Sequence, residues 1–350
     1  MRVLHYADDN MLSWAQPYIQ LLEALRDKGC DNVIACRPMG TLSGLMRDAG
    51  FEVHTYKPKV SSIPGLALGF RDIVRAVRPN IIHTRLSSAA HIAGFWGRRL
   101  HVPVAATVDK FPRKKYYAHA VHILPCSTPV AEFMASQGVP REKMTVIHNA
   151  VNVKNYARNE TARRNIRIAE GFGDNTVCFL GMGRLVDWKG FDDLLRAFAE
   201  LKGEERDYRL WIAGDGPERE KLGSLAQQLG IHERVKFWGF VKNVKHLLWG
   251  ADIYVHPSWG EEAFGLSLLE AMSAGLPAIA SRSGGMTEIL GDSYGLTFPR
   301  RDIDSLAGCM RKSIIDADAL SESALRRAWD FDISAVSART LDVYIKILHG

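Results

Sequence analysis

The chain has 350 residues, of which 47% are hydrophobic and 24% charged, an ordinary composition for a globular protein that folds in water. No apolar run approaches the roughly 18 residues of a membrane span, and the first residues, MRVLHYA, lack the basic and then apolar pattern of a signal segment. Five cysteines without CxxC spacing favour reduced thiols, so we expect a cytoplasmic protein of two domains.

The positive charge is concentrated in the first part of the chain. Residues 1–150 hold 19 Lys and Arg against 11 Asp and Glu, a net charge of +8, whereas the remainder has a net charge of −2. A solvated basic face explains this excess, and so does attraction to an anionic membrane surface or to an acidic lipid-linked acceptor. We expect no nucleic-acid partner, because no recognition motif accompanies the charge. Much of the excess comes from Lys57, Lys59, Arg71, Arg75, Arg78, Lys110, Arg113, Lys114 and Lys115.

Residues 1–150 alternate between short apolar runs and segments with helical periodicity. Ile19, Leu22 and Leu25, for example, recur on one helix face before Gly29 stops the helix. Strands that alternate with helices indicate a parallel sheet covered on both faces. We predict strands at 3–6, 33–36, 51–56, 80–83, 103–108, 121–125 and 144–148, and helices at 13–28, 41–49, 66–77, 89–99 and 129–137.

A second α/β series follows a polar, basic segment, 151–174, that we interpret as an interdomain linker. Both series are typical of a doubly wound, Rossmann-like α/β domain, which binds ligands at the carboxyl ends of its strands. We therefore divide the chain into domains at 1–150 and 151–332, with an amphipathic helix at 333–348 near its end. In the second domain we predict strands at 177–180, 208–213, 235–237, 253–255 and 278–281, and helices at 191–202, 218–229, 244–249, 304–315, 321–329 and from 266 onward.

Two carboxylates stand out in the segment from 251 to 287. Glu262 lies in a polar loop after a predicted strand, and Glu270 lies within an otherwise apolar helix. A carboxylate in such surroundings is either buried with partners or faces a cleft. An ordinary strand–helix–strand unit, with a carboxylate near the start of the helix, explains either residue alone.

A glycine-containing turn with two cations follows the first strand of the second series. It reads Gly181-Met-Gly183-Arg184-Leu-Val-Asp-Trp-Lys189-Gly190 and is neither a dinucleotide fingerprint nor a P-loop. Backbone N–H groups at a strand–helix turn bind anions, and two cations five residues apart suit a diphosphate leaving group. A glycine turn with surface cations is the alternative.

Five segments together resemble the retaining glycosyltransferases of family 4, which have the GT-B fold. The E-x7-E motif matches 262–270, and the G-R-L-x-x-x-K-G motif matches 183–190. The G-x-G-P turn matches 214–217, where we favour a structural role for Asp215; F-x-G matches 237–239, and the hinge segment I-x-N-G-V-D matches 147–152. The resemblance implies two Rossmann-like domains facing a cleft, an acceptor-binding first domain, a nucleotide-sugar-binding second domain, and a final helix, 333–350, that crosses back to the first domain.

The resemblance also implies roles for residues of the second domain. Arg184 and Lys189 hold the donor pyrophosphate, Glu262 contacts donor-sugar hydroxyls, and Glu270 holds the nucleotide ribose. Val241, one of the residues that follow the F-x-G segment, contacts the base. Backbone amides near Phe264, Gly265 and Leu266 add to the pyrophosphate grip.

Two departures from the family pattern fall in the first domain. The Gly-Gly loop that usually precedes the first helix is replaced by Leu12-Ser13, where Ser13 keeps a hydroxyl that donates hydrogen bonds. The family's histidine after the fifth strand is replaced by Asp109. This carboxylate either contacts an acceptor hydroxyl, as a catalytic residue, or caps a loop.

We therefore predict a hexosyltransferase that uses a nucleotide diphosphate sugar, such as a UDP-sugar, as co-substrate and a glycan or glycolipid as acceptor. Cell-envelope polysaccharide or lipopolysaccharide assembly at the inner face of the membrane is the expected setting. We expect no cofactor and no metal, because the D-x-D sequences at 302–304, 316–318 and 330–332 fall at predicted helix starts, where carboxylates cap. The alternatives are a sugar-nucleotide epimerase of the same fold and a catalytically degenerate sugar-nucleotide-binding protein.

Overall fold

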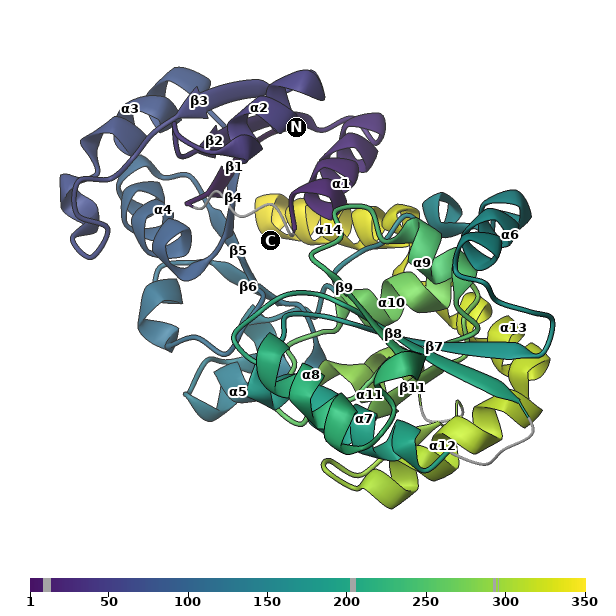
Figure 1. Cartoon of the computed structure of the whole chain (residues 1–350). Coiled ribbons are helices and arrows are strands. Elements are labelled where there is room, and N and C mark those ends of the chain that lie inside the picture. Colours follow the sequence, from purple (N-terminus) through teal and green to yellow (C-terminus); the bar gives the residue numbers. More distant parts are fainter. Residues whose placement is uncertain (9–13, 202–205, 292–293, 295) are drawn as a thin grey trace. The chain divides into compact units, whose positions relative to one another are not determined.

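The computed structural model describes residues 1–8, 14–201, 206–291, 294 and 296–350. The chain divides into two compact units, one formed by Met1–Asn152 with Phe331–Gly350 and the other by Val153–Asp330. Each unit contains one six-stranded parallel sheet with helices around it (Figure 1). The sheets share one topology. The strand order is β3-β2-β1-β4-β5-β6 in unit 1 and, read in the same sense, β9-β8-β7-β10-β11-β12 in unit 2. The predicted doubly wound α/β fold is therefore confirmed for both units.

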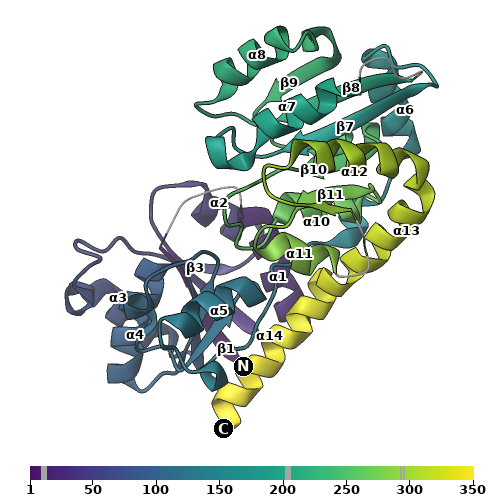
Figure 2. The same cartoon turned by 90° about the horizontal axis from the view of Figure 1, so that it is seen from below.

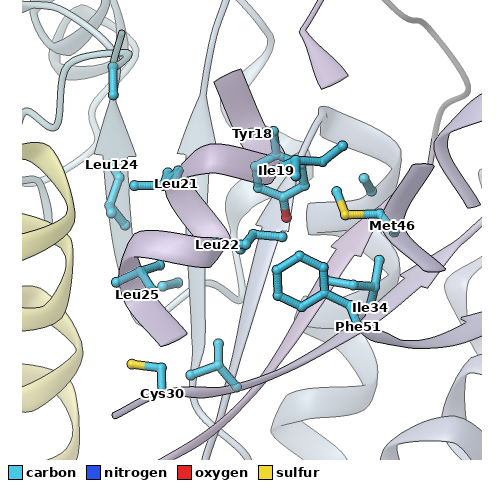
Figure 3. Packing of buried hydrophobic residues seen from close by; sticks show 14 of the residues in the cluster. Tyr18, Ile19, Leu21, Leu22, Leu25, Cys30, Ile34, Met46, Phe51 and Leu124 are labelled. Carbon is cyan, nitrogen blue, oxygen red and sulfur yellow. The ribbon is translucent and has the colours of Figure 1, made fainter. Parts of the chain in front are cut away.

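In unit 1, helices cover both faces of the sheet, because its central strands are buried on both sides. The face that carries Val3 and Ile34 packs against α1, α2 and α14, and Figure 3 shows Leu21, Leu22 and Leu25 of α1 in this core. The opposite face packs against α3 and α4. The elements are β1 (Arg2–Ala7), α1 (Ala15–Asp27), β2 (Asp31–Cys36), α2 (Thr41–Asp48), β3 (Glu52–Thr55), α3 (Leu68–Val77), β4 (Ile81–Arg85), α4 (Ser87–Leu100), β5 (Val104–Val108), β6 (His122–Pro125), α5 (Thr128–Ser136) and α14 (Ile333–His349).

The last helix, α14, belongs to unit 1. Val336, Val343 and Tyr344 pack in the same core as α1, and the Tyr344 hydroxyl lies 2.5 Å from Nδ1 of the buried His83 in β4. Asp332 begins this helix by accepting a hydrogen bond from the Ser334 N–H, and Asp302 caps α12 in the same way through Ser305. The D-x-D sequences at these two places thus supply helix caps.

Unit 2 repeats the arrangement, and Figure 2 shows α10 and α12 on either side of β10 and β11. Its elements are α6 (Glu160–Ala169), β7 (Thr176–Met182), α7 (Phe191–Ala199), β8 (Asp207–Ala213), α8 (Arg219–Gln228), β9 (Val235–Gly239), α9 (Lys245–Gly250), β10 (Ile253–His256), α10 (Leu266–Ser273), β11 (Ala278–Ser281), α11 (Gly285–Leu290), β12 (Thr297–Phe298), α12 (Ile303–Ile315) and α13 (Ala317–Ala328).

Two predicted segments are corrected by the structure. Residues 151–174 are not simply a linker, because they contain α6, whose Arg163 and Arg167 bind the Asp252 carboxylate at 2.5 and 2.9 Å. The cations that made this segment look like a solvated linker are the ones that attach it to unit 2. Residues 144–148 form only one isolated bridge, from Met144 to Ile123 in β6, and no strand. The helix α11 and the short strand β12 have no counterpart among the predicted elements.

Candidate functional site

Two loops meet at the carboxyl edge of the unit 2 sheet. One follows β7 and carries Lys189, and the other follows β10 and carries Glu262; β7 and β10 are neighbouring parallel strands. Backbone hydrogen bonds join these loops, since the Trp188 carbonyl accepts from the N–H groups of Trp259 at 3.0 Å and Gly260 at 3.1 Å. The edge lies where open α/β sheets bind their ligands.

Glu262 is the centre of a hydrogen-bonded cluster at this edge. Its Oε1 accepts from Lys189 Nζ, from the Ser258 hydroxyl at 2.9 Å, and faces Nε2 of His256 at 3.2 Å. His256 ends β10, and its other ring nitrogen, Nδ1, lies 3.3 Å from the Tyr254 hydroxyl. The two charged residues that the sequence singled out on separate loops are thus brought together, with a histidine behind them.

The electrostatics of this cluster favour an ionised Glu262. Burial alone raises the pKa of the carboxyl group, but the hydrogen bond from His256 and the charge of Lys189 hold that pKa well below its usual range. Burial lowers the pKa of His256 in turn, although its bond to Glu262 opposes this. A neutral His256 beside an ionised Glu262 fits the lowered pKa of each residue, with Lys189 as the cationic partner of the carboxylate.

Two glycines let the loops approach this closely. Gly190 has φ +68°, and a Cβ there would lie 2.2 Å from the Pro257 carbonyl oxygen. Gly284 has φ +50°, and a Cβ there would lie 2.1 Å from the Glu262 carbonyl oxygen. Any other residue at either position displaces backbone of the loop that carries Glu262.

Glu270 lies on α10 and has a single described partner, Tyr156, whose hydroxyl donates to Oε1 at 2.9 Å. Burial raises the pKa of Glu270 to about 7, and the hydrogen bond from Tyr156 offsets only part of this rise. A carboxylate with so few partners retains capacity to accept further hydrogen bonds.

Of the remaining predicted residues of unit 2, Phe264, Gly265 and Leu266 lie between these two carboxylates in sequence, whereas Arg184 and Val241 follow other strands. Gly265, with φ +119°, is the N-cap of α10, Leu266 begins that helix, and Phe264 is buried just before it. Arg184 is exposed, and within the described ranges its guanidinium forms no ion pair or hydrogen bond. Val241 is half-buried after β9. The G-x-G-P turn supports the Arg184 loop, because the Asp215 carbonyl accepts from the Leu185 N–H at 2.9 Å.

In unit 1, Asp109 follows β5 and faces Arg85 at the end of β4, with Arg85 Nη1 and Asp109 Oδ2 3.8 Å apart. Asp109 Oδ1 is buried and has no hydrogen-bond partner. The predicted Leu12 and Ser13 lie outside the described residues.

Sequence reasoning missed three residues that the structure places beside the predicted ones: His256, Tyr156 and Arg85. His256 ends the strand that leads to Glu262, and Arg85 ends a strand adjacent to that of Asp109. The signal for both was a polar residue at the carboxyl end of an apolar run. Tyr156, more than 100 residues from Glu270 in sequence, left no such signal.

Two features bear on membranes and metals in the part of the chain that the structure describes. It contains no helix both long and apolar enough to pass through a membrane. It also contains no group of three His, Cys, Asp or Glu side chains arranged to hold a metal ion.

Two family models match the chain: Glycosyltransferase Family 4 over residues 18–155 and Glycosyl transferases group 1 over residues 162–328. The chain belongs to glycosyltransferase family 4. The family resemblance read from the five motifs is thereby confirmed, and it supports the glycosyltransferase interpretation over the epimerase and the degenerate binding protein.

Individual relatives and solved structures match the chain over different lengths. The lipopolysaccharide core biosynthesis glycosyltransferase LpsE of Rhizobium meliloti is 24% identical over 99% of both chains. An uncharacterized glycosyltransferase of Methanocaldococcus jannaschii, MJ1607, is 34% identical, but the matched part covers 59% of this chain and 51% of that protein. The crystal structure of Anabaena HepE in complex with UDP covers 99% of this chain and 100% of that one, with a TM-score of 0.87 and 19% identity. This likeness confirms the GT-B fold of the family-4 chain.

Proposed function

We propose that this glycosyltransferase moves a hexose, with retention of anomeric configuration, from a nucleotide diphosphate sugar to a glycan or glycolipid acceptor. The observation that carries the proposal is the Lys189–Glu262 pair, which two joined loops hold at the carboxyl edge of the unit 2 sheet. A fixed cation there stabilises charge that develops on a departing diphosphate, and a fixed carboxylate binds sugar hydroxyls.

Each predicted donor residue has a place in this scheme. Lys189 and the exposed Arg184 bind the pyrophosphate, with the backbone amides at Phe264, Gly265 and Leu266. Glu262 accepts from donor-sugar hydroxyls, and Glu270 accepts from the ribose hydroxyls. Val241, after β9, contacts the base.

The reaction needs no covalent intermediate with the protein. The bond between the anomeric carbon and the diphosphate oxygen breaks, the acceptor oxygen bonds to that carbon on the same face, and the acceptor proton passes to the departing diphosphate. Asp109 accepts a hydrogen bond from the acceptor hydroxyl. The cations at Arg184 and Lys189 supply the positive charge that a metal ion supplies in other transferases, so we propose metal-independent transfer.

We further propose lipopolysaccharide or related polysaccharide assembly as the setting, supported by the full-length similarity to LpsE, whose name assigns it to lipopolysaccharide core biosynthesis. The proposed nucleotide base of the donor is likewise supported by a similar protein. The HepE structure was obtained with UDP, and we propose a UDP-sugar as donor for this chain.

An anionic membrane surface is the proposed partner of unit 1. Residues 60–68 expose four aliphatic side chains within nine positions, those of Val60, Ile63, Leu66 and Leu68. This segment packs against α4, where Phe95, Arg98 and Arg99 line a groove with His101 and His119. Exposed aliphatic side chains beside clustered arginines suit insertion into an interface of acidic lipids.

Nucleotide release tests the transferase proposal. The protein is incubated with UDP-, GDP- and ADP-sugars, with and without an acceptor extract and with and without EDTA. We expect acceptor-dependent release from a UDP-sugar that EDTA does not abolish, and an α-linked product by NMR from an α-linked donor. The absence of release from every donor contradicts the transferase, an inverted product contradicts retention, and loss with EDTA contradicts metal independence.

Vesicle binding tests the membrane proposal separately. We expect the protein to sediment with vesicles of phosphatidylglycerol but not of phosphatidylcholine. The double variant Ile63→Ser, Leu66→Ser should lose most of this binding. The control is Ile168→Ser, which removes an even more exposed aliphatic side chain of unit 2. Equal binding by both variants contradicts the proposal.

A further inference from the structure

Four charged residues of alternating sign follow four neighbouring strands at the carboxyl edge of the unit 1 sheet. Arg37 follows β2, Asp8 follows β1, Arg85 ends β4 and Asp109 follows β5, and the strands lie side by side in that order. In the strand register, Ala7 lies opposite both Cys36 and Arg85. The row therefore contains two neighbouring ion pairs.

The two pairs differ in how completely they are closed. Asp8 and Arg37 form two hydrogen bonds, from Arg37 Nε to Oδ1 at 2.7 Å and from Nη2 to Oδ2 at 3.2 Å. In the second pair, Arg85 Nη1 and Asp109 Oδ2 are 3.8 Å apart, which is too long for a hydrogen bond. Asp8 is satisfied by its partner, whereas Asp109 is not.

The Arg85 guanidinium is held away from Asp109 by other contacts. Its Nη2 donates to Asn149 Oδ1 at 3.1 Å, and its Cζ lies 5.0 Å from the centre of the Tyr18 ring. These contacts fix the plane of the guanidinium from two sides. Arg85 therefore presents Nη1 to the carboxylate without closing the gap.

Both members of the open pair keep unused hydrogen-bonding capacity. Arg85 Nε and Asp109 Oδ1 are buried without partners, which is costly for charged groups. The side chains are 13% and 21% exposed, so the pair remains accessible at one side. An oxygen atom at hydrogen-bonding distance from both Nη1 and Oδ2 fits beside a 3.8 Å gap.

We propose that Arg85 and Asp109 together bind one hydroxyl group of the acceptor saccharide. The hydroxyl accepts from Arg85 Nη1 and donates to Asp109 Oδ2, which a hydroxyl can do at once and an ammonium or a carboxylate group cannot. Arg85 is a binding residue, fixed by Asn149 and Tyr18, that orients the hydroxyl toward the carboxylate. The assignment rests on the proposed transferase function for the identity of the saccharide as acceptor.

Binding without turnover tests this site separately from catalysis. The probes are a delipidated lipopolysaccharide core oligosaccharide and the methyl glycosides of glucose, galactose and mannose, observed by saturation-transfer NMR. We expect a signal from the wild type that Arg85→Gln and Asp109→Asn both lose. Arg141→Gln is the matched control, because its ion pair with Glu132 is exposed on the same unit. A melting curve for each variant identifies any that fails to fold, in which case the other carries the test.

The results distinguish a failure of the proposed hydroxyl site from a failure of the proposed transferase function. An unchanged signal in both folded variants, or no signal from the wild type with any probe, overturns the hydroxyl site. A signal that depends on Arg85 and Asp109 in a protein that transfers no sugar supports the site and overturns the transferase function. If the protein does transfer, we expect the variants to raise the acceptor KM roughly tenfold or more, while the dissociation constant for UDP stays within twofold of the wild type.

Discussion

The ion pair Lys189–Glu262 at the carboxyl edge of the unit 2 sheet is closed, like Asp8–Arg37 in unit 1, whereas the ion pair Arg85–Asp109 at the carboxyl edge of the unit 1 sheet is open. In unit 2, Glu262 has three hydrogen-bonding neighbours, and the loop that holds it is bonded to the loop that holds Lys189. In unit 1, Arg85 and Asp109 face each other across a gap. Since the sheets share one topology, the difference comes from the loops and not from the fold. A closed pair has its geometry fixed before a ligand arrives, whereas an open pair is completed by one.

The largest expected effect comes from removing the cation of the closed pair Lys189–Glu262. Lys189→Ala leaves Glu262 without its charged partner and, in the proposed donor site, the diphosphate without a half-buried cation. We expect kcat for sugar transfer to fall by about 10²–10³-fold. Nucleotide release with a saturating donor measures this.

Lys221→Ala is the matched control, since Lys221 is an exposed lysine of unit 2 that pairs with Glu218. Its kcat should equal that of the wild type. A similar fall in both variants contradicts a specific role for Lys189 in the closed pair.

The next largest effect is expected on the stability of unit 2, at Asp252, just before the strand that leads to Glu262. Asp252 precedes β10 and binds Arg163, Arg167 and the N–H of Cys178. Asp252→Ala therefore leaves two half-buried guanidinium groups without their carboxylate, although both keep hydrogen bonds to backbone carbonyls. We expect a loss of about 3 kcal/mol in the free energy of unfolding, measured by urea denaturation. The exposed pair of unit 1 gives the comparison, because Glu132→Gln should lower the free energy of unfolding far less than Asp252→Ala. Equal losses of unfolding free energy in Asp252→Ala and Glu132→Gln would contradict a larger contribution from the Asp252 contacts.

A smaller effect concerns Glu270 and pH. In the proposed donor site a ribose hydroxyl donates to the ionised carboxylate. Since the pKa of Glu270 is raised to about 7, UDP affinity should rise between pH 6 and pH 8. Glu270→Gln should bind UDP about tenfold more weakly at pH 8 and lack this rise. Calorimetry at several pH values measures both, and the titration of the nucleotide itself appears in both proteins. A parallel pH dependence in the two proteins contradicts the ribose role.

The same carboxyl group makes stability depend on pH. Its pKa is higher in the folded protein than the usual 4.5, so the folded state binds more protons between about pH 4.5 and pH 7. The contribution of Glu270 to stability is therefore present at the low end of this window and is lost as the pH rises through 7. Glu270→Gln should show a flatter stability profile across the window in thermal melts.

The smallest effect is expected at Arg184, which is exposed and free of side-chain partners in the described parts of unit 2. Arg184→Gln should weaken UDP binding severalfold, and less than Lys189→Ala lowers kcat, because solvent screens an exposed charge. Affinity should approach that of the variant when the ionic strength of the wild-type sample is raised. An effect of Arg184→Gln that is independent of salt contradicts an electrostatic role.

The sequence predicted much of this arrangement for physical reasons that differ between the units. In unit 2, Gly183, Arg184, Lys189, Glu262 and Glu270 lie at fixed spacings on two loops and a helix, so local sequence carries the pattern. The strands were predictable because buried parallel strands read as apolar runs. The packing of α6 was not, because its arginines are satisfied by Asp252, more than 80 residues away.

Unit 1 was harder to predict because its open pair joins residues from separate strands. Asp109 stood out by its position, but Arg85 is a single charged residue after an apolar run, and its partners Asn149 and Tyr18 are about 65 residues away on either side. No local spacing connects them. Only the parallel register, which places Arg85 beside Thr107, brings it to the edge that Asp109 occupies.

One measurement tests most directly whether the unit 2 edge binds the nucleotide and the unit 1 edge does not. UDP, GDP and ADP are titrated calorimetrically into the wild type, Glu270→Gln and Arg85→Gln at pH 8. We predict that Glu270→Gln weakens the tightest-binding nucleotide about tenfold, whereas Arg85→Gln leaves its dissociation constant within twofold of the wild type. Weaker nucleotide binding in Arg85→Gln, with Glu270→Gln unchanged, would contradict the account.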